Sequence, residues 1–352
     1  MARIALLAAP GLAVIVYREL STFNIKITQD RRVNLRNHDL IVGSIAEKDI
    51  QKLRKLRTVE DLFIILLEDS PVKTKADLAK LIPSGFKSKV LESLRHLPPR
   101  KGSKVTTHFA VFVKKDMDRE VRRDQISTQI SNWLSLQFNK WKAKEPADIE
   151  FWCFYADEKV TTGLRITDHS FRNRSYREAE REGALRPTIA AAIALLGEIR
   201  KDDTVLDPMC GSGTILIERA LYGGVRKTIG CDIDEDAISV VKRNSRKANL
   251  DIDLFNADSC DPSVLEDYIG QVDVILSNLP FGKKYQKADN LYQKALASWV
   301  PLLAPGGRIS ILTSDPKAIA IEAKKYRLKI KDRFRMRVKG ELVEVTTLFK
   351  NK

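Results

Sequence analysis

A glycine turn between a buried strand and a helix constrains the fold of this chain more than any other feature. Residues 204–206 are β-branched or apolar, as in a buried parallel strand, and residues 214–220 carry apolar side chains at helical spacing. Between them, Gly211 and Gly213 lack the Cβ atoms that would block a ligand. The first N–H groups of a helix favour an anionic or hydrogen-bond-accepting ligand. The stretch therefore predicts a strand–turn–helix unit with a ligand at the turn.

Position 216 argues against a nicotinamide dinucleotide as that ligand. The dinucleotide fingerprint needs a third glycine there, and this chain has Leu216. A second apolar strand ends at Asp232, whose carboxylate can accept hydrogen bonds from ribose hydroxyls, and two more strands end at Asp258 and Asn278. Each Asp alone could equally be a helix N-cap. Four polar strand ends in this order instead favour a binding site at one edge of an open α/β sheet.

Four motifs stand at these strand ends: DPMCGSGT at 207–214, GCDID at 230–234, NAD at 256–258 and SNLPFG at 277–282. Together they resemble the Rossmann-like S-adenosylmethionine-dependent methyltransferases. The NLPFG segment is similar to the (N/D)PP(F/Y/W) loop of the members that methylate exocyclic amino groups. With an RNA-binding amino-terminal half, the chain resembles the THUMP-domain tRNA guanosine-N2 methyltransferases that modify position 6. The resemblance covers nearly the whole chain.

This resemblance implies a fold, a cofactor and a set of site residues. The implied fold is a seven-stranded class I methyltransferase domain of the α/β class, preceded by α+β ferredoxin-like and THUMP domains. The implied cofactor is S-adenosyl-L-methionine, and no metal is needed. The implied catalytic residues are Asn278, Leu279, Pro280 and Phe281. The implied cofactor-binding residues are Asp207, Pro208, Cys210, Gly211, Gly213, Thr214, Asp232, Ile233, Asp258, Ser259 and Asn278.

The implied catalytic loop suits an amine substrate. An exocyclic amine is a poor nucleophile because its lone pair is delocalised into the ring. The Asn278 side-chain oxygen and the Leu279 carbonyl oxygen can each accept one N–H, which aims the lone pair at the methyl group. Pro280 fixes the loop, and Phe281 can stack on an extruded base, a contact worth about 1–3 kcal/mol. Positioning rather than acid–base chemistry lowers the barrier, on an unpaired or flipped base.

The cysteines indicate neither zinc nor nucleophilic catalysis. Cys153, Cys210, Cys231 and Cys260 have no CxxC spacing, which excludes a zinc knuckle and indicates a reducing compartment. RNA cytosine-C5 methyltransferases use a cysteine that follows a proline in the fourth-strand loop, where this chain has Phe281. We expect Cys210 to be a packing residue of the turn.

The net charge of +15 is unevenly distributed. Residues 1–150 carry 28 basic against 18 acidic side chains and residues 301–352 carry 13 against 5, whereas residues 201–300 carry 12 against 16. Basic flanks around an acidic centre suit a bound polyanion, here tRNA. The alternative is a lysine-rich surface that only solvates the protein. The expected RNA-binding residues are Lys114, Lys115, Arg122, Arg172 and Arg174.

A chain of 352 residues exceeds the usual size of one domain. We expect a ferredoxin-like domain over 1–58, a THUMP RNA-binding domain over 59–166, a linker over 167–186 and the methyltransferase domain over 187–352. The second of these should contain a long helix from Asp118 to Trp141. The linker resembles a segment of related methyltransferases that contacts cofactor or RNA, and a plain interdomain connection is the alternative.

The amino terminus is apolar but is interrupted by Pro10 and Gly11, so we expect a strand, a turn and a helix there instead of a signal peptide. No apolar run approaches the ~20 residues of a membrane span. We therefore expect a soluble cytoplasmic protein without a membrane partner. The sequence does not determine the oligomeric state, and a monomer is the expectation.

Several functions share these motifs. Nothing in NLPFG separates guanine-N2 from adenine-N6 methylation, and only the RNA-binding half favours tRNA. Guanine-N2 methylation of ribosomal RNA or of tRNA at another position is the nearest alternative. A noncatalytic RNA-binding factor that keeps the methyltransferase fold is the alternative from a different class.

Overall fold

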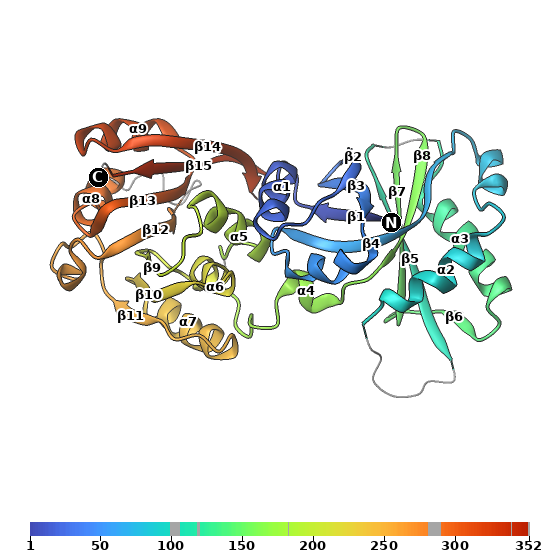
Figure 1. Ribbon diagram of the computed structural model, residues 1–352, viewed down its shortest axis with the longest axis horizontal. Helices are drawn as coiled ribbons and strands as arrows, with labels where there is room; N and C mark the ends of the chain where they lie inside the picture. The colour runs from blue at the N-terminus through green and yellow to red at the C-terminus, as the bar shows by residue number, and fades with distance from the viewer. Residues whose placement is uncertain (99–105, 118–119, 182, 281–289, 339, 351–352) are drawn as a thin grey trace. The chain divides into compact units, whose positions relative to one another are not determined.

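The chain divides into two compact units, Met1–Arg172 and Asn173–Lys352. The computed structural model in Figure 1 describes residues 1–98, 106–117, 120–181, 183–280, 290–338 and 340–350. Each unit is built around one sheet. In the described part of the chain, no helix is both long and apolar enough to cross a bilayer.

Unit 1 contains a sheet in the order β2-β3-β1-β4-β8-β7-β5-β6. Its strands are β1 (Ala2–Ala8), β2 (Thr28–Leu35), β3 (His38–Ile45), β4 (Val59–Pro71), β5 (Thr107–Lys115), β6 (Trp141–Ala143), β7 (Ile149–Ala156) and β8 (Lys159–Arg165). Its helices are α1 (Ala13–Thr22), α2 (Phe86–Ser93) and α3 (Arg123–Gln137), with 3-10 turns η1 (Glu47–Lys55), η2 (Lys75–Lys80) and η3 (Leu94–His96). Helix α4 (His169–Asn173) follows β8.

The expected boundary at residue 58 falls directly before β4. This strand pairs with β1 on one side and with β8 on the other, so one sheet runs through both expected amino-terminal domains. Residues 1–172 are accordingly one compact unit. The finer division into ferredoxin-like domain, THUMP domain and linker stays a prediction.

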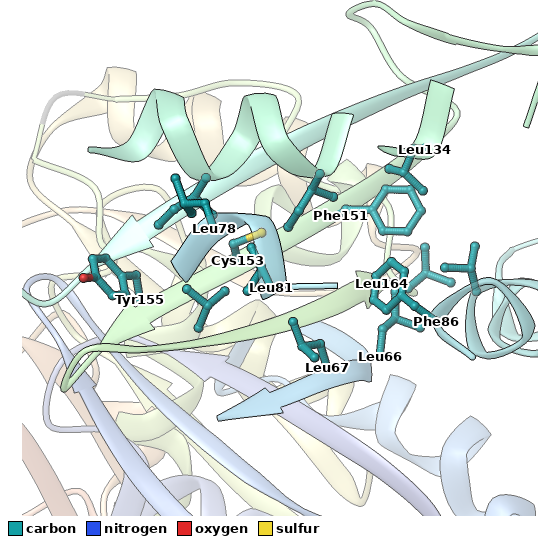
Figure 2. Packing of buried hydrophobic residues seen from close by; sticks show 14 of the residues in the cluster. Leu66, Leu67, Leu78, Leu81, Phe86, Leu134, Phe151, Cys153, Tyr155 and Leu164 are labelled. Atoms are coloured by element: carbon teal, nitrogen blue, oxygen red, sulfur yellow. The ribbon is translucent and has the colours of Figure 1, made fainter. Parts of the chain in front are cut away.

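The core of unit 1 forms where α3 packs on the sheet. Ile126, Ile130 and Leu134 recur at helical spacing on α3 and are fully buried. Figure 2 shows Leu134 beside Phe151 of β7, and Leu164 of β8 belongs to the same buried cluster. This apolar contact fixes the helix on the sheet.

Helix α3 is shorter than the predicted helix from Asp118 to Trp141. The chain leaves the helix at Phe138, whose ring stacks on Trp141 with centroids 4.2 Å apart. Trp141 then begins β6, which pairs in parallel with β5. The predicted length was wrong because sheet pairing ends the helix. Trp133 and Trp141 pack against the core, as predicted.

Unit 2 contains the predicted seven-stranded sheet, in the order β11-β10-β9-β12-β13-β15-β14. Its strands are β9 (Asp203–Asp207), β10 (Val225–Asp232), β11 (Asp253–Asn256), β12 (Val272–Asn278), β13 (Leu303–Thr313), β14 (Lys329–Val338) and β15 (Glu341–Phe349). Its helices are α5 (Pro187–Leu196), α6 (Thr214–Leu221), α7 (Glu235–Lys247), α8 (Leu291–Trp299) and α9 (Pro316–Lys325), with 3-10 turn η4 (Glu266–Tyr268). Strands β9 to β13 are parallel, and β15 runs antiparallel to both of its neighbours.

The topology of unit 2 puts four strand ends at one edge. Strands β11, β10, β9 and β12 are adjacent and parallel, so their carboxyl ends meet there. The prediction that four polar strand ends meet at one edge of the sheet, at β9 to β12, is confirmed.

Strand β14 carries its predicted basic side chains on the exposed face, while Met336 and Val338 point inward.

Candidate active site

The glycine turn joins β9 to α6 and is held by backbone hydrogen bonds. The Cys210 N–H donates to the Cys231 carbonyl at 2.9 Å, and the Gly213 N–H donates to the Cys210 carbonyl at 2.8 Å. Gly211 and Gly213 both have positive φ, +54° and +72°. A Cβ on Gly211 would meet nothing within 4 Å, whereas one on Gly213 would lie 2.8 Å from the Val241 side chain. Gly213 is therefore required by packing against α7, not by approach of a ligand as we expected.

A cavity of about 820 Å³ lies at the carboxyl edge of the sheet. Ten of the predicted cofactor-binding and catalytic residues line it: Pro208, Cys210, Gly211, Thr214, Asp232, Ile233, Asp258, Ser259, Asn278 and Pro280. Three others, Asp207, Gly213 and Leu279, do not. The glycine turn and the tip of β12 thus face one space, which is within the size range of small-molecule sites.

Asp207 lies behind the turn instead of in the cavity. Its side chain is 1% exposed, and burial raises the pKa of this carboxyl to about 8. One carboxyl oxygen accepts the Met209 N–H at 3.2 Å. Asp207 therefore supports the turn from inside. The prediction that Asp207 contacts the cofactor directly is corrected.

Asp232 holds the turn and borders the cavity at the same time. One carboxyl oxygen accepts the Gly211 N–H at 2.8 Å, and the other accepts the Asp234 N–H at 3.0 Å. The next residue, Ile233, is 72% exposed despite its apolar side chain. An exposed apolar side chain beside a carboxylate provides a surface for a ring next to a sugar.

The tip of β12 presents Asn278 to the cavity. The Oδ1 atom of Asn278 is buried and has no hydrogen-bond partner among the described residues. The Leu279 side chain is fully buried, and the Leu279 N–H donates to the Leu312 carbonyl at 3.1 Å, so the backbone here is fixed to β13. Phe281, the predicted stacking residue, lies outside the described residues. A buried acceptor without a donor marks where a donor of the substrate can bind.

The segment 174–185 contributes a further wall of the cavity, which agrees with the cofactor-contact reading of the predicted linker over the plain interdomain connection. Arg181, Gly183, Ala184 and Leu185 line the cavity. Arg181 forms an ion pair with Asp234. Leu291 and Lys294 of α8 and Val338 and Glu341 of the last hairpin also line the cavity and were not predicted.

Arg174 is the anchor of this segment and not an RNA contact. Its side chain is buried, and its Nε donates to Glu218 Oε1 of α6 at 3.1 Å. The Tyr176 hydroxyl donates to the same carboxyl oxygen at 2.8 Å. The prediction that Arg174 binds RNA is corrected, because its guanidinium compensates the buried charge of Glu218.

The remaining predicted RNA contacts lie in unit 1 and differ in accessibility. Lys115 is buried, so the prediction that its side chain contacts RNA is corrected. Lys114 lies over the Trp152 ring at 5.3 Å, and burial lowers the pKa of its ammonium group. Arg122 is exposed and pairs with an acidic neighbour at 2.9 Å, and Arg172 lies 3.9 Å from the Asp61 carboxylate. Lys114, Arg122 and Arg172 remain predicted contacts.

All four cysteines are free, and Cys210 is buried in the turn. Burial, together with the carboxylates of Asp207 and Asp232, raises the pKa of the Cys210 thiol well above its usual value. A neutral buried thiol is a poor nucleophile. This environment agrees with the predicted packing role.

Comparison with known proteins identifies the unit that contains the cavity. Residues 174–344 match the family described as RMKL-like, methyltransferase domain. Most of unit 2 is thus similar to a methyltransferase domain. Its fold is that of class I methyltransferases, whose cofactor is S-adenosylmethionine.

Two solved structures align with both units of this chain. The crystal structure of TrmN from Thermus thermophilus aligns with a TM-score of 0.78 at 21% identity, over 99% of this chain and 100% of TrmN. The structure of SMU.472 in complex with SAH aligns with a TM-score of 0.68 at 17% identity, over 100% of this chain and 98% of that chain. At these identities the likeness shows the fold alone.

Two curated relatives align with different shares of this chain. The U6 snRNA (guanine-N(2))-methyltransferase THUMPD2 of Bos taurus is 25% identical over 86% of this chain and 60% of its own length. The tRNA (guanine(6)-N2)-methyltransferase of Thermus thermophilus is 31% identical over 45% of this chain and 48% of its own length. The chain thus spans about half to 60% of the length of these relatives.

The cavity of unit 2 fits S-adenosylmethionine. The space at Gly211, the carboxylate of Asp232 and the exposed Ile233 suit a nucleoside with an attached charged chain. The Ser259 hydroxyl is buried in the cavity wall and has no partner among the described residues, so a ligand atom can satisfy it.

Proposed function

We propose that this methyltransferase transfers a methyl group to the exocyclic N2 of a guanosine in tRNA, at position 6 in the acceptor stem. One observation carries the proposal: Asn278 lines the same cavity as the glycine turn, and its Oδ1 has no hydrogen-bond partner among the described residues. The names of the two curated relatives support guanine-N2 chemistry on RNA. The likeness to a tRNA (guanine(6)-N2)-methyltransferase supports position 6.

S-adenosylmethionine supplies the activated methyl group when bound. The chain's own part is to hold the amine. Asn278 Oδ1 accepts one N–H of the amino group, and the Leu279 carbonyl oxygen accepts the other. Pro280, which has no N–H, keeps the loop shape. With both N–H bonds held, the nitrogen lone pair points at the methyl carbon, and orientation supplies most of the rate enhancement.

The cofactor contacts in this proposal follow the cavity wall. The Asp232 carboxylate accepts ribose hydroxyls, Ile233 packs on the adenine ring, and Asp258 and Ser259 hydrogen-bond the adenine edge. Thr214 and the turn at Pro208, Cys210 and Gly211 border the amino-acid end. A guanine paired in a stem cannot reach this depth, so the target base must be unpaired or flipped.

RNA binding in this proposal depends on the basic surfaces of both units. Lys114, Arg122 and Arg172 contact phosphates from unit 1. The exposed basic face of β14 in unit 2 adds a second patch. Phosphate contacts of this kind give affinity that falls steeply with salt.

The test is transfer from labelled S-adenosylmethionine to unmodified tRNA, followed by nucleoside mass spectrometry and nuclease mapping. We expect N2-methylguanosine at position 6, and its loss when position 6 is changed to adenosine. A ribosomal RNA fragment, a U6 snRNA transcript and tRNAs with guanosine only at other positions are run in parallel. N2-methylguanosine only in one of those RNAs overturns the choice of substrate, and tight tRNA binding without transfer shows a noncatalytic factor.

A further inference from the structure

The hairpin of β14 and β15 extends past the edge at which Asn278 stands. Asn278 of β12 pairs with Leu312 of β13, and Leu312 pairs with Val345 of β15. Because β15 is antiparallel, its first residues continue beyond that edge. Glu341 begins β15 four residues before Val345, so at ~3.3 Å per residue its backbone lies about 13 Å further out. From there Glu341 reaches the cavity wall.

The strand order places Glu341 and the cofactor residues on opposite sides of Asn278. Asp232 ends β10, which lies on one side of β12 beyond β9, and Glu341 begins β15, which lies on the other side beyond β13. All three residues line one cavity. With the cofactor at Asp232, the Glu341 wall faces the acceptor base.

Glu341 differs from the other carboxylates of this cavity. Asp232 accepts the Gly211 N–H, Asp258 accepts the Cys260 N–H at 2.9 Å, and Asp234 pairs with Arg181. Glu341 is exposed, and no hydrogen bond or ion pair joins its carboxylate to another described residue. Its carboxylate is thus available to a ligand.

We propose that the Glu341 carboxylate accepts a hydrogen bond from the N1–H of the target base and so selects guanine over adenine. This inference rests on the proposed function. Guanine carries a donor at N1 beside its 2-amino group, whereas adenine carries an acceptor at N1 beside its 6-amino group. Asn278 and Leu279 hold either amine equally well. A carboxylate accepts from the N1–H of guanine but repels the N1 lone pair of adenine, and a polar site built for one pattern rejects the other strongly.

The test compares two bases at the target position of an otherwise identical RNA. One is guanine and the other is 2-aminopurine, which keeps the 2-amino group but has an acceptor at N1. The wild-type protein, Glu341→Gln and Glu341→Ala are measured on both. Glu266→Gln is the control, because Glu266 is exposed and does not line the cavity. The dissociation constant for S-adenosylmethionine of each variant reports that the domain is folded.

We expect the wild-type kcat/KM to favour guanine over 2-aminopurine. The Gln side chain of Glu341→Gln can donate to N1 of 2-aminopurine, so its kcat/KM on 2-aminopurine should rise. The ratio of kcat/KM on guanine to kcat/KM on 2-aminopurine should therefore fall by about tenfold or more. In Glu341→Ala the ratio should fall through a loss on guanine, with cofactor affinity unchanged in both variants. Active variants that keep the wild-type ratio overturn the role of Glu341 alone. A wild-type protein that methylates no guanine in any RNA overturns the proposed function, and this inference with it.

Discussion

The side-chain amide of Asn244 holds the backbone of Ala179 by two hydrogen bonds. Its Oδ1 accepts the Ala179 N–H at 3.1 Å, and its Nδ2 donates to the Ala179 carbonyl oxygen at 3.2 Å. The same Nδ2 lies 3.3 Å from the Ser212 carbonyl oxygen of the glycine turn. Asn244 is 1% exposed. A single buried amide of α7 therefore joins two walls of the cofactor cavity.

We predict that Asn244→Asp weakens cofactor binding although Asn244 does not line the cavity. The carboxylate cannot donate to the Ala179 and Ser212 carbonyls, and leaving buried carbonyls unpaired costs about 1–3 kcal/mol. Calorimetry should give a dissociation constant for S-adenosylmethionine raised about tenfold. Lys247→Ala, an exposed change on the same helix, should leave it unchanged. Equal affinity of Asn244→Asp and wild type would show that the backbone at Ala179 is held without this amide.

Asp232→Asn should lower cofactor affinity through the ribose hydroxyls. The substitution replaces the charged carboxylate acceptor with a neutral amide oxygen. Because hydrogen bonds to charged groups contribute about 1.5–3 kcal/mol, the dissociation constant for S-adenosylmethionine should rise about 10-fold to 100-fold. Asp236→Asn, an exposed carboxylate in the first turn of α7, is the matched control. If both variants bind S-adenosylmethionine with wild-type affinity, Asp232 serves only to hold the Gly211 N–H.

Asp207 should make the stability of the domain depend on pH. Burial raises its pKa to about 8 from a usual value of 3.8, so between these values the folded protein holds a proton that the unfolded chain releases. The contribution to stability is complete below about pH 4 and is lost as pH rises to about 8, by at most about 1.4 kcal/mol per pH unit. Denaturant unfolding at several pH values in this window measures the slope.

Asp207→Asn supplies the comparison for that slope. The amide is neutral at every pH and can still accept the Met209 N–H, so its unfolding free energy should fall less steeply with pH than that of the wild type. Parallel profiles for the two proteins would mean that Asp207 is ionised in the folded state.

The edge of the sheet was predictable because each of its parts is local in sequence. The strands ending at Asp232 and Asn278 carry apolar residues with a polar terminus, and the glycine turn sits directly between its strand and its helix. Parallel order then brings these ends together without further information. The basic residues at alternate positions of β14 could be predicted from the sequence for the same reason.

The side walls of the cavity were not predictable, because they depend on contacts between distant residues. Asn244 and Ala179 are 65 positions apart, and a single Asn in a helix pattern gives no sign of its partner. Arg174 reads as a surface cation until Glu218, 44 positions away, is found beside it. Helix α3 was overestimated because pairing of Trp141 with β5 overrides helix propensity.

The central claim is that Asn278 aims an amine at the methyl group of a cofactor held by the glycine turn. Single-turnover transfer to tRNA by Asn278→Ala, measured beside its dissociation constant for S-adenosylmethionine, tests this claim most directly. We predict that transfer falls by about 100-fold or more while the dissociation constant changes less than about threefold, since orientation of the nucleophile is lost and the cofactor contacts remain. Wild-type transfer by Asn278→Ala, or a loss of transfer fully explained by weaker cofactor binding, would contradict it.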